Sequence, residues 1–258
     1  MSVLLRPLLA LLLLAVLFAG VERVAPVLGR RRTWWEARRD AAWFLLDAGV
    51  RGLARGLTVL LLLAVALLLG WELTEASFRG FGPLGSQPRA VQAVEILVLS
   101  DGLGYLLHRA FHTVPWLWRI HAVHHASTHL DWLAAARAHP LNALLTRPLQ
   151  AVPLVLLGFD PTSVAVVVPL LGVWAIALHA DVRWRLGPLR HVLASPAFHR
   201  WHHAPEPGLR NLAGLLPVWD LLGGTFHLPE EDALRSGLDD LEVPDGILAQ
   251  LRFPFRAG

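Results

Sequence analysis

Five apolar stretches alternate with short polar segments along the chain. They cover residues 3–20, 53–71, 90–107, 141–159 and 163–180. Each approaches the ~20 residues that a helix needs to cross a bilayer, although Glu95 and Asp101 make the third stretch the least lipid-like. The pattern predicts an all-α integral membrane protein with about four to five transmembrane helices. The composition supports this fold class, because 55% of the residues are hydrophobic and only 17% are charged.

The first apolar stretch combines Arg6 with a leucine-rich core, as signal peptides do. No A-x-A cleavage site follows the stretch, so we expect it to stay in the protein as an uncleaved helix. We divide the chain into three parts: N-terminal membrane helices with an arginine-rich loop (1–89), a histidine-rich central part (90–228) and an acidic tail (229–258). We expect this polar tail to be peripheral.

The arginines predict how the helices are oriented. The segment between the first two stretches contains Arg23, Arg30, Arg31, Arg32, Arg38, Arg39 and Arg51, and Arg55 follows at the start of the second stretch. Only Arg79 and Arg89 lie between the second and third stretches. Because cytoplasmic loops are enriched in basic residues, the first loop is predicted to be cytoplasmic. Counting the spans from there places residues 108–139 and 179–203 on that same side, at what we expect to be a bacterial inner membrane.

The rest of the composition excludes several classes of function. All 23 basic residues are arginine, which we attribute to genomic base composition. The net charge of +3 comes without the basic stripe that nucleic-acid binding requires. Without cysteine there are no disulfides, iron–sulfur clusters or thiolate zinc sites. The chain also lacks H-E-x-x-H, G-x-S-x-G, and a G-x-G-x-x-G loop after a strand, so any reducing equivalents must come from another protein.

Three histidine clusters carry the candidate chemistry. Eight of the 13 histidines fall within residues 108–112, 121–125 and 199–203, which read H-x-x-x-H, H-x-x-H-H and H-x-x-H-H. In helices, these spacings place the rings on one face. Imidazole binds iron, zinc, copper and nickel, and eight rings exceed the four ligands of one tetrahedral ion. We therefore predict a site for two metal ions with the ligands His108, His112, His121, His124, His125, His199, His202 and His203.

Two further histidines are candidate ligands. His179 ends the fifth apolar stretch at the same predicted membrane boundary as the clusters. His139, which precedes Pro140, is a ligand candidate with a supporting role or a substrate gate as alternatives. The histidines without partners at ligand spacing, which we do not expect to bind metal, are His129, His191 and His227.

Two aspartates are candidates for orienting these ligands. Ligand histidines commonly donate their second ring N–H to a carboxylate. Asp101 lies seven residues, or two helical turns, before His108, and Asp181 lies close to His179. Arginines also lie among the clusters, where contact with lipid phosphates or docking of an acidic electron donor would explain them; they are Arg109, Arg119, Arg137 and Arg200.

Together these motifs resemble the fatty acid hydroxylase superfamily, or sterol desaturase family, whose members are membrane-embedded non-haem di-iron oxygenases. The similarity runs from about residue 101 to residue 226. It rests on Asp101, Tyr105-Leu-Leu-His108-Arg109-Ala-Phe-His112, Leu117-Trp-Arg-Ile-His121-Ala-Val-His124-His125, Arg137-Ala-His139-Pro140, Ser195-Pro-Ala-Phe-His199-Arg-Trp-His202-His203 and Trp219-Asp220-Leu-Leu-Gly-Gly224-Thr225-Phe226. Three ordered clusters and the Trp-Asp…Gly-Thr motif make the match specific.

The resemblance implies a catalytic domain over residues 90–228. It implies that the cluster histidines, joined by His179, hold two iron ions, with zinc able to replace them on purification. It further implies O2 as cosubstrate, an external electron donor protein and a membrane lipid substrate. That substrate would be a fatty acyl, sterol-like or isoprenoid chain, and hydroxylation and desaturation both remain open because they begin with the same hydrogen abstraction.

The chain departs from the family pattern at three places. Residues 211–214 read Asn-Leu-Ala-Gly where many relatives have Asn-Tyr-Gly, Asn142 replaces a glutamate, and Gly223 replaces a phenylalanine. These changes leave the metal ligands intact and leave the substrate open. The alternative function is a non-catalytic metal-binding membrane protein, a carrier or sensor, which would spread polar residues along several helices at mid-membrane. A haem protein with two histidine ligands is a second alternative.

Overall fold

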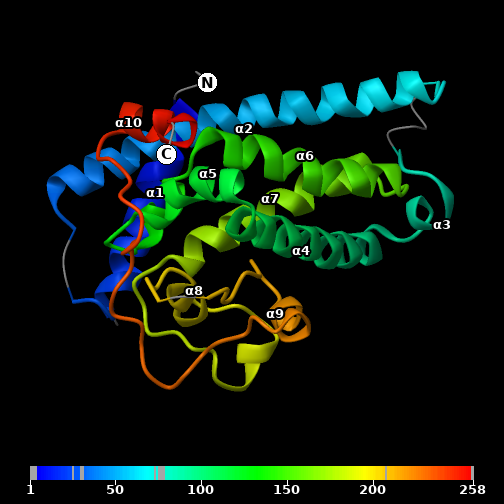
Figure 1. Cartoon of the computed structure of the whole chain (residues 1–258). Coiled ribbons are helices and arrows are strands. Elements are labelled where there is room, and N and C mark those ends of the chain that lie inside the picture. The colour runs from blue at the N-terminus through cyan, green and yellow to red at the C-terminus, as the bar shows by residue number, and fades with distance from the viewer. Residues whose placement is uncertain are drawn as a thin grey trace.

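The computed structural model describes residues 5–24, 26–29, 32–72, 74, 79–206 and 208–256, a part of the chain built from helices and loops without a strand (Figure 1). The longer helices are α1 (Leu5–Val24), α2 (Trp34–Leu68), α4 (Arg89–Thr113), α5 (Pro115–His125), α6 (Pro140–Leu156) and α7 (Pro161–Leu178). The short ones are α3 (Gly82–Gly85), η2 (Trp132–Ala136), η3 (Gly187–His191), α8 (Pro196–His202), α9 (Val218–Gly223), α10 (Ile247–Arg252) and η4 (Phe253–Phe255).

Four of these helices, α1, α2, α4 and α7, are long and apolar enough to cross a membrane. Helix α6 covers most of the fourth predicted stretch but has 17 residues and contains Pro148 and Pro153. The prediction of an all-α integral membrane protein with about four to five spans is therefore confirmed.

Helix α2 begins much earlier than the apolar stretch that predicted it. Thr33 and Glu36 form a capping box, in which each side chain accepts a hydrogen bond from the backbone N–H of the other residue. The helix has 35 residues, a rise of about 52 Å against a hydrocarbon core of about 30 Å. Its N-terminal half therefore extends beyond any bilayer that its apolar half spans, and much of the arginine-rich segment is helix rather than loop.

Helices α2, α4, α6 and α7 form the central bundle. Helix α4 packs against α5, α6 and α7, and α2 lies along α6. Ile96, Leu154, Phe159 and Val164 fill the core between α4, α6 and α7. The segment that contains α8 and α9 packs on one side of this bundle (Figure 1), so histidines from the last cluster are brought to the ends of α4 and α5.

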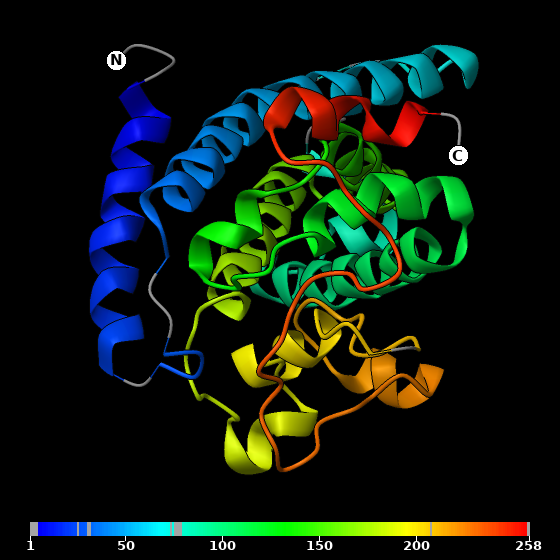
Figure 2. The same ribbon diagram turned by 60° about the vertical axis from the view of Figure 1, so that its left-hand side comes forward.

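Helix α1 stands at the edge of the molecule (Figure 2) and is fixed by its C-terminal half. Phe18 stacks on Trp132, with ring centroids 5.6 Å apart. Glu22 accepts hydrogen bonds from the backbone N–H groups of Trp132 and Asp181, both at 3.0 Å. The end of α1 is therefore tied to η2, which follows the second histidine cluster, and to the residues just after His179.

The C-terminal segment, predicted to be peripheral, packs onto α2 and α5. Phe253 lies against Trp43, Ala122 and Val123 in one buried cluster, and the indole Nε1 of Trp43 donates to Gln250 Oε1 at 3.2 Å. The acidic residues that suggested a peripheral tail lie before this apolar anchor. Residues 247–255 are thus part of the core that supports the second histidine cluster.

Candidate metal centre

The structure brings nine histidines into two adjoining groups. The first contains His108, His112, His121, His125 and His202, and the second contains His124, His179, His199 and His203. Within each group the facing ring nitrogens lie within 4.8 Å of one another, and the rings are buried or half-buried. The rings of His125 and His203 stack with centroids 4.4 Å apart, so the groups adjoin. All eight cluster histidines and His179 therefore meet, as the sequence predicted.

The spacing of each cluster explains how it is shared between the groups. The clusters lie in α4, in α5 and in α8 with its C-cap His203. Residues i and i+4 stay together, because one helical turn brings their rings to the same place. In α5 the i, i+4 pair is His121 and His125, which belong to the first group, whereas His124 belongs to the second. In α8 the pair is His199 and His203, which belong to the second group, whereas His202 belongs to the first. Each H-x-x-H-H motif thus supplies both groups.

The outer ring nitrogens are held by backbone carbonyl groups. Nδ1 of His108 donates to the Leu212 carbonyl at 2.7 Å, and Nδ1 of His124 donates to the Arg137 carbonyl at 2.9 Å. The other two bonds of this kind join His179 to Ala175 (2.7 Å) and His202 to Arg210 (2.8 Å). A carbonyl oxygen can only accept, so each of these Nδ1 atoms carries the ring hydrogen. In a neutral ring, Nε2 is then left with a lone pair directed into its group.

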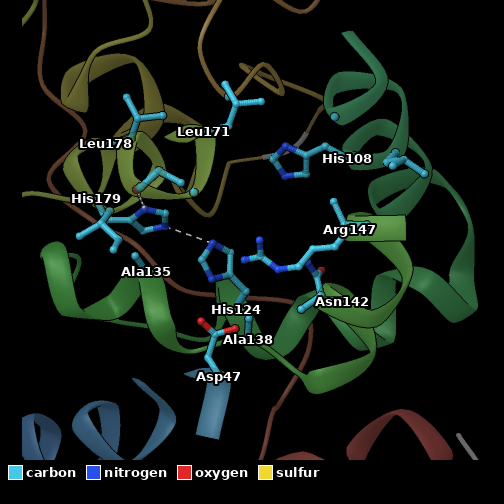
Figure 3. Close-up of a pocket in the computed structure, with 18 of the residues that line it drawn as sticks. Asp47, His108, His124, Ala135, Ala138, Asn142, Arg147, Leu171, Leu178 and His179 are labelled. Carbon is cyan, nitrogen blue, oxygen red and sulfur yellow. Dashed lines mark hydrogen bonds between the residues drawn. The ribbon is translucent and has the colours of Figure 1, made fainter. Parts of the chain in front are cut away.

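Facing lone pairs make both groups fit for a cation. Nε2 of His124 lies 3.1 Å from Nε2 of His179 (Figure 3), and Nε2 of His108 lies 3.0 Å from Nε2 of His121. Neither nitrogen of the first pair can donate to the other, because both hydrogens are on Nδ1. The Nε2 atoms without any hydrogen-bond partner in the described part of the chain include those of His112, His125 and His202. Buried acceptors of this kind are costly unless something binds them, and a metal ion satisfies them.

Burial keeps these rings neutral. It lowers the pKa of His124 to about 4. Burial, with the neighbouring His124 as a smaller cause, lowers the pKa of His179 to about 3. Neutral imidazole is the form that binds metals, so the second group is prepared for a cation at neutral pH.

The sequence suggested that Asp101 accepts the second N–H of His108, but the structure gives this carboxylate other partners. Its two carboxylate oxygens accept from the backbone N–H groups of Leu215 and Leu216, both at 2.8 Å. It thereby fixes the loop of residues 211–216, whose Leu212 carbonyl orients His108. Asp101 supports the ligand through this loop.

Asp181 is likewise separated from the ligand that it was expected to orient. It accepts from the backbone N–H of Val27 at 3.0 Å and from Arg200 Nη1 at 3.3 Å, whereas His179 donates to Ala175. The carboxylate anchors the segment after α1 against α8. The reason is geometric: at the end of α7, the carbonyl one turn back is nearer to the ring than any side chain.

His139 lies outside both groups, and its ring is already engaged. Nδ1 accepts from the backbone N–H of Leu141 at 3.2 Å, which caps α6, and Nε2 donates to the Leu251 carbonyl at 3.0 Å. His139 therefore joins the start of α6 to the C-terminal segment. Among the three histidines not expected to bind metal, none belongs to either group.

The four arginines among the clusters form hydrogen bonds to other residues of the protein. Arg137 and Arg200 are 2% and 1% exposed, so neither can dock an electron donor or touch lipid phosphates. Arg137 Nε donates to Asp40 at 3.2 Å, Arg119 donates to the Phe253 carbonyl at 3.1 Å, and Arg109 donates to the Tyr105 hydroxyl at 2.9 Å. The last contact explains Gly223, because a Cβ at that position would overlap the Tyr105 hydroxyl.

Two supporting residues were missed by the sequence analysis. Asp220, fully buried, accepts from the backbone N–H groups of Leu212 and Ala213 at 2.7 and 2.8 Å. Asn211 has a positive φ of 53° and binds the carbonyls of Phe198 and His227 through Nδ2. Both residues shape the loop that orients His108. The Trp-Asp motif was a visible signal for Asp220, but its role depends on a contact that the sequence does not show.

Asn142 is the remaining supporting residue, and it stands where the sequence departs from the family pattern. Its Oδ1 lies 2.9 Å from Nδ1 of His121. We expect Asn142→Ala to lower metal affinity by about 10–100-fold, the usual effect of losing a partner that orients a ligand. Competition with a chelator, followed by elemental analysis, measures this change. Asn142→Asp, which retains an acceptor oxygen, should keep more metal than the alanine variant, and equal retention in both variants would contradict the assigned role.

A cavity of about 270 Å³ reaches both groups (Figure 3). His108 and His121 from the first group and His124, His179 and His199 from the second lie along its wall. The remaining wall is largely apolar, with side chains such as Phe44, Phe111, Leu171 and Leu178. A largely apolar cavity beside candidate metal ligands can hold a hydrocarbon segment close to them.

Comparison with known proteins agrees with this geometry. The fatty acid hydroxylase family matches residues 93–225. The chain is 32% identical over 245 residues to the ornithine lipid hydroxylase of Rhizobium tropici, which covers 93% of this chain and 72% of that protein. It is 34% identical over 136 residues to the alkylglycerol monooxygenase of Danio rerio (52% of this chain, 30% of that protein). The human alkylglycerol monooxygenase is 35% identical over 154 residues (58% and 34%).

The chain spans about a third of these two alkylglycerol monooxygenases, and no solved structure shows significant similarity to it. The family match covers half of the chain, and the bacterial relative is similar along most of its own length. Hydroxylases and monooxygenases are oxidoreductases, and this favours an enzyme over a carrier or sensor. The chain therefore belongs to the fatty acid hydroxylase family of membrane oxidoreductases.

Proposed function

We propose that this protein hydroxylates or desaturates a membrane lipid in an O2-dependent reaction at a di-iron centre. The observation that carries the proposal is the pair of histidine groups with facing lone pairs beside an apolar cavity. One ion would be held by His108, His112, His121, His125 and His202, and the other by His124, His179, His199 and His203. When bound, the irons would supply O2 activation and the oxidising power to remove hydrogen from an unactivated C–H bond.

The protein's own residues prepare this site in three ways. The carbonyls of Leu212 and Arg137 hold two of the rings in the tautomer that presents Nε2. The loop fixed by Asp101 and Asp220 forms part of the cavity wall through Leu212, Ala213 and Gly214. The apolar wall, which includes Phe111 and Leu178, excludes water and positions a hydrocarbon segment beside the two groups. These roles need no further catalytic side chain.

The lipid and the electron donor are inferred from the setting of the site. A fatty acyl, sterol-like or isoprenoid chain would reach the cavity from the bilayer. An external donor protein would deliver electrons, because the sequence carries no recognisable flavin or nucleotide fold. The arginine-rich segment before and within α2 supports a cytoplasmic position for the histidine site in a bacterial inner membrane.

Metal content and lipid products test the proposal together. After expression with ample iron, elemental analysis of the detergent-purified protein should find about two iron ions per chain. Lipid extracts from cells grown under isotopically labelled dioxygen should contain a lipid with one labelled oxygen atom, or an unsaturated lipid without the label. Cells that lack the gene provide the control. Protein without bound metal, or lipid profiles identical to the control, would contradict the proposed function.

A further inference from the structure

One cation in the cavity has no partner. Arg147, from the middle of α6, lines the same cavity as His108, His124 and His179 and extends into it (Figure 3). Its Nε is buried without a hydrogen-bond partner. In the described part of the chain, the side chain makes neither a hydrogen bond nor an ion pair. Arg147 is half-buried, and a partly desolvated charge is stabilised by an ion partner, so this unpaired guanidinium is available to bind an anion.

A second arginine lies beside the first. Arg51 of α2 lines the same cavity, and its Nε donates to Asp47 Oδ2 at 2.5 Å. Gly172 of α7 leaves space next to both guanidinium groups, since a Cβ there would lie 3.8 Å from Arg51 Nη1 and 3.9 Å from Arg147 Nη2. Three helices thus frame a small space with two cations at its edge.

The carboxylates of the cavity do not neutralise this pair. Asp47 is engaged by Arg51, and Asp101 accepts the two backbone N–H groups of Leu215 and Leu216. One positive charge therefore remains without a counter-ion next to Gly172. Guanidinium binds carboxylate and phosphate oxygens through parallel N–H groups, which identifies the chemistry of the anion that fits.

The position of the pair relates this anion to the lipid. The Arg51 side chain is 33% exposed, so the cavity approaches the surface of α2 there. Just beyond Arg51, the helix exposes apolar residues such as Leu53 and Leu60, at 67% and 64%. This junction of polar and apolar surface is where lipid headgroups lie. On α6, Arg147 lies five residues after Asn142, which contacts His121, a rise of about 7.5 Å.

We propose that Arg147 and Arg51 bind an anionic group, a carboxylate or a phosphate, of the lipid substrate. The inference rests on the proposed function and narrows its substrate class to anionic lipids. The charged group sits at the α2–α6–α7 space beside Gly172, and the hydrocarbon part lies along the apolar wall towards the histidines. Arg147 is thus a specificity-determining residue that acts by binding, without touching the reacting carbon.

Calorimetric titration of the purified full chain in a nonionic detergent tests the inference. The probes are dodecanoate, dodecyl phosphate and dodecanol, which share one chain and differ in headgroup, together with inorganic phosphate. The wild-type protein should bind both anionic amphiphiles about tenfold or more tightly than dodecanol. Loss of a charge-assisted hydrogen bond in Arg147→Gln should weaken their binding by about 10–100-fold and leave dodecanol unchanged.

Two further variants separate charge recognition from misfolding. Gly172→Leu keeps both arginines but fills the space between them, so it should also lose the preference for anions. Arg235→Gln removes an exposed arginine that pairs with Asp239 and does not line the cavity, so its affinities should match the wild type. The inference is overturned if wild-type protein binds dodecanol as tightly as the anions, or if Arg147→Gln keeps the preference. Binding of inorganic phosphate as tight as that of dodecyl phosphate would overturn it too, because the ligand would then be free phosphate.

Metal content distinguishes this inference from the proposed function. Each protein is analysed for iron before titration. If the wild-type protein holds two metals but shows no preference for the anionic amphiphiles, the inference is refuted and the proposed function is not. Anion preference in a wild-type protein that binds no metal would refute the proposed function alone.

Discussion

Replacing His124 with alanine is expected to reduce bound metal from about two ions per chain to about one. His124 belongs to the group of four histidines, so its loss leaves three ligands. His125→Ala should retain more metal, because the group of five keeps four ligands. The double variant should fall below one ion per chain. Activity should drop by more than about a hundredfold in the double variant, since even loss of a supporting residue costs about 10–100-fold.

Elemental analysis and thermal unfolding of the same preparations measure this difference. His227→Ala is the matched control, because His227 belongs to neither group and its ring packs on Trp201; it should keep both metals. Equal metal content in His124→Ala, His125→Ala and the control would contradict the assignment of the histidines to two metal-binding groups. A metal loss that follows a general loss of folded protein would be recognised from the unfolding curves.

The histidine clusters were predictable from sequence because their chemistry is local. Spacings of three and four residues bring side chains together on any helix, whatever the rest of the fold does. His179 could be added because it ends an apolar stretch at the same predicted boundary. The division of these histidines into two groups could not be predicted from the sequence, since it depends on how α5 and α8 face each other.

The residues that orient the ligands could not be identified in the same way. A carboxylate near a histidine in sequence suggested Asp101 and Asp181, yet both bind backbone N–H groups of distant segments. The carbonyl groups that orient His108 and His124 belong to Leu212 and Arg137. Every residue has a carbonyl group, so sequence carries no signal for which one lies next to a ring.

The prediction of helix lengths from the sequence was limited by a different factor. Hydropathy marks the apolar part of a helix, and α2 continues far beyond it because the Thr33–Glu36 capping box starts the helix in polar sequence. The same limitation applied to residues 229–258, where acidic residues outweighed the few apolar ones that anchor the segment. Phe253 is 6% exposed, and its burial depends on the partner Trp43, 210 positions earlier in the chain.

Asp220→Ala is expected to destabilise the protein and weaken its metal binding at the same time. The fully buried carboxylate accepts from Leu212 N, Ala213 N and Thr225 Oγ1, the last at 2.6 Å. Alanine would leave two buried backbone N–H groups unpaired, at about 1–3 kcal/mol each, a large share of a typical total of about 5–15 kcal/mol. The Leu212 carbonyl would also lose its fixed position, so His108 should bind metal less well.

Thermal unfolding and chelator competition should therefore change together in Asp220→Ala. Asp220→Asn retains one acceptor oxygen but offers an N–H to a neighbouring donor, so we expect an intermediate effect. Asp239→Ala, in an exposed ion pair with Arg235, is the control, because exposed pairs contribute about 0–1 kcal/mol. A stable Asp220→Ala protein with wild-type metal affinity would show that the loop keeps its shape without this carboxylate. In that case the orientation of His108 would have to depend on Asp101 and Asn211, the two other side chains that hold residues 211–216.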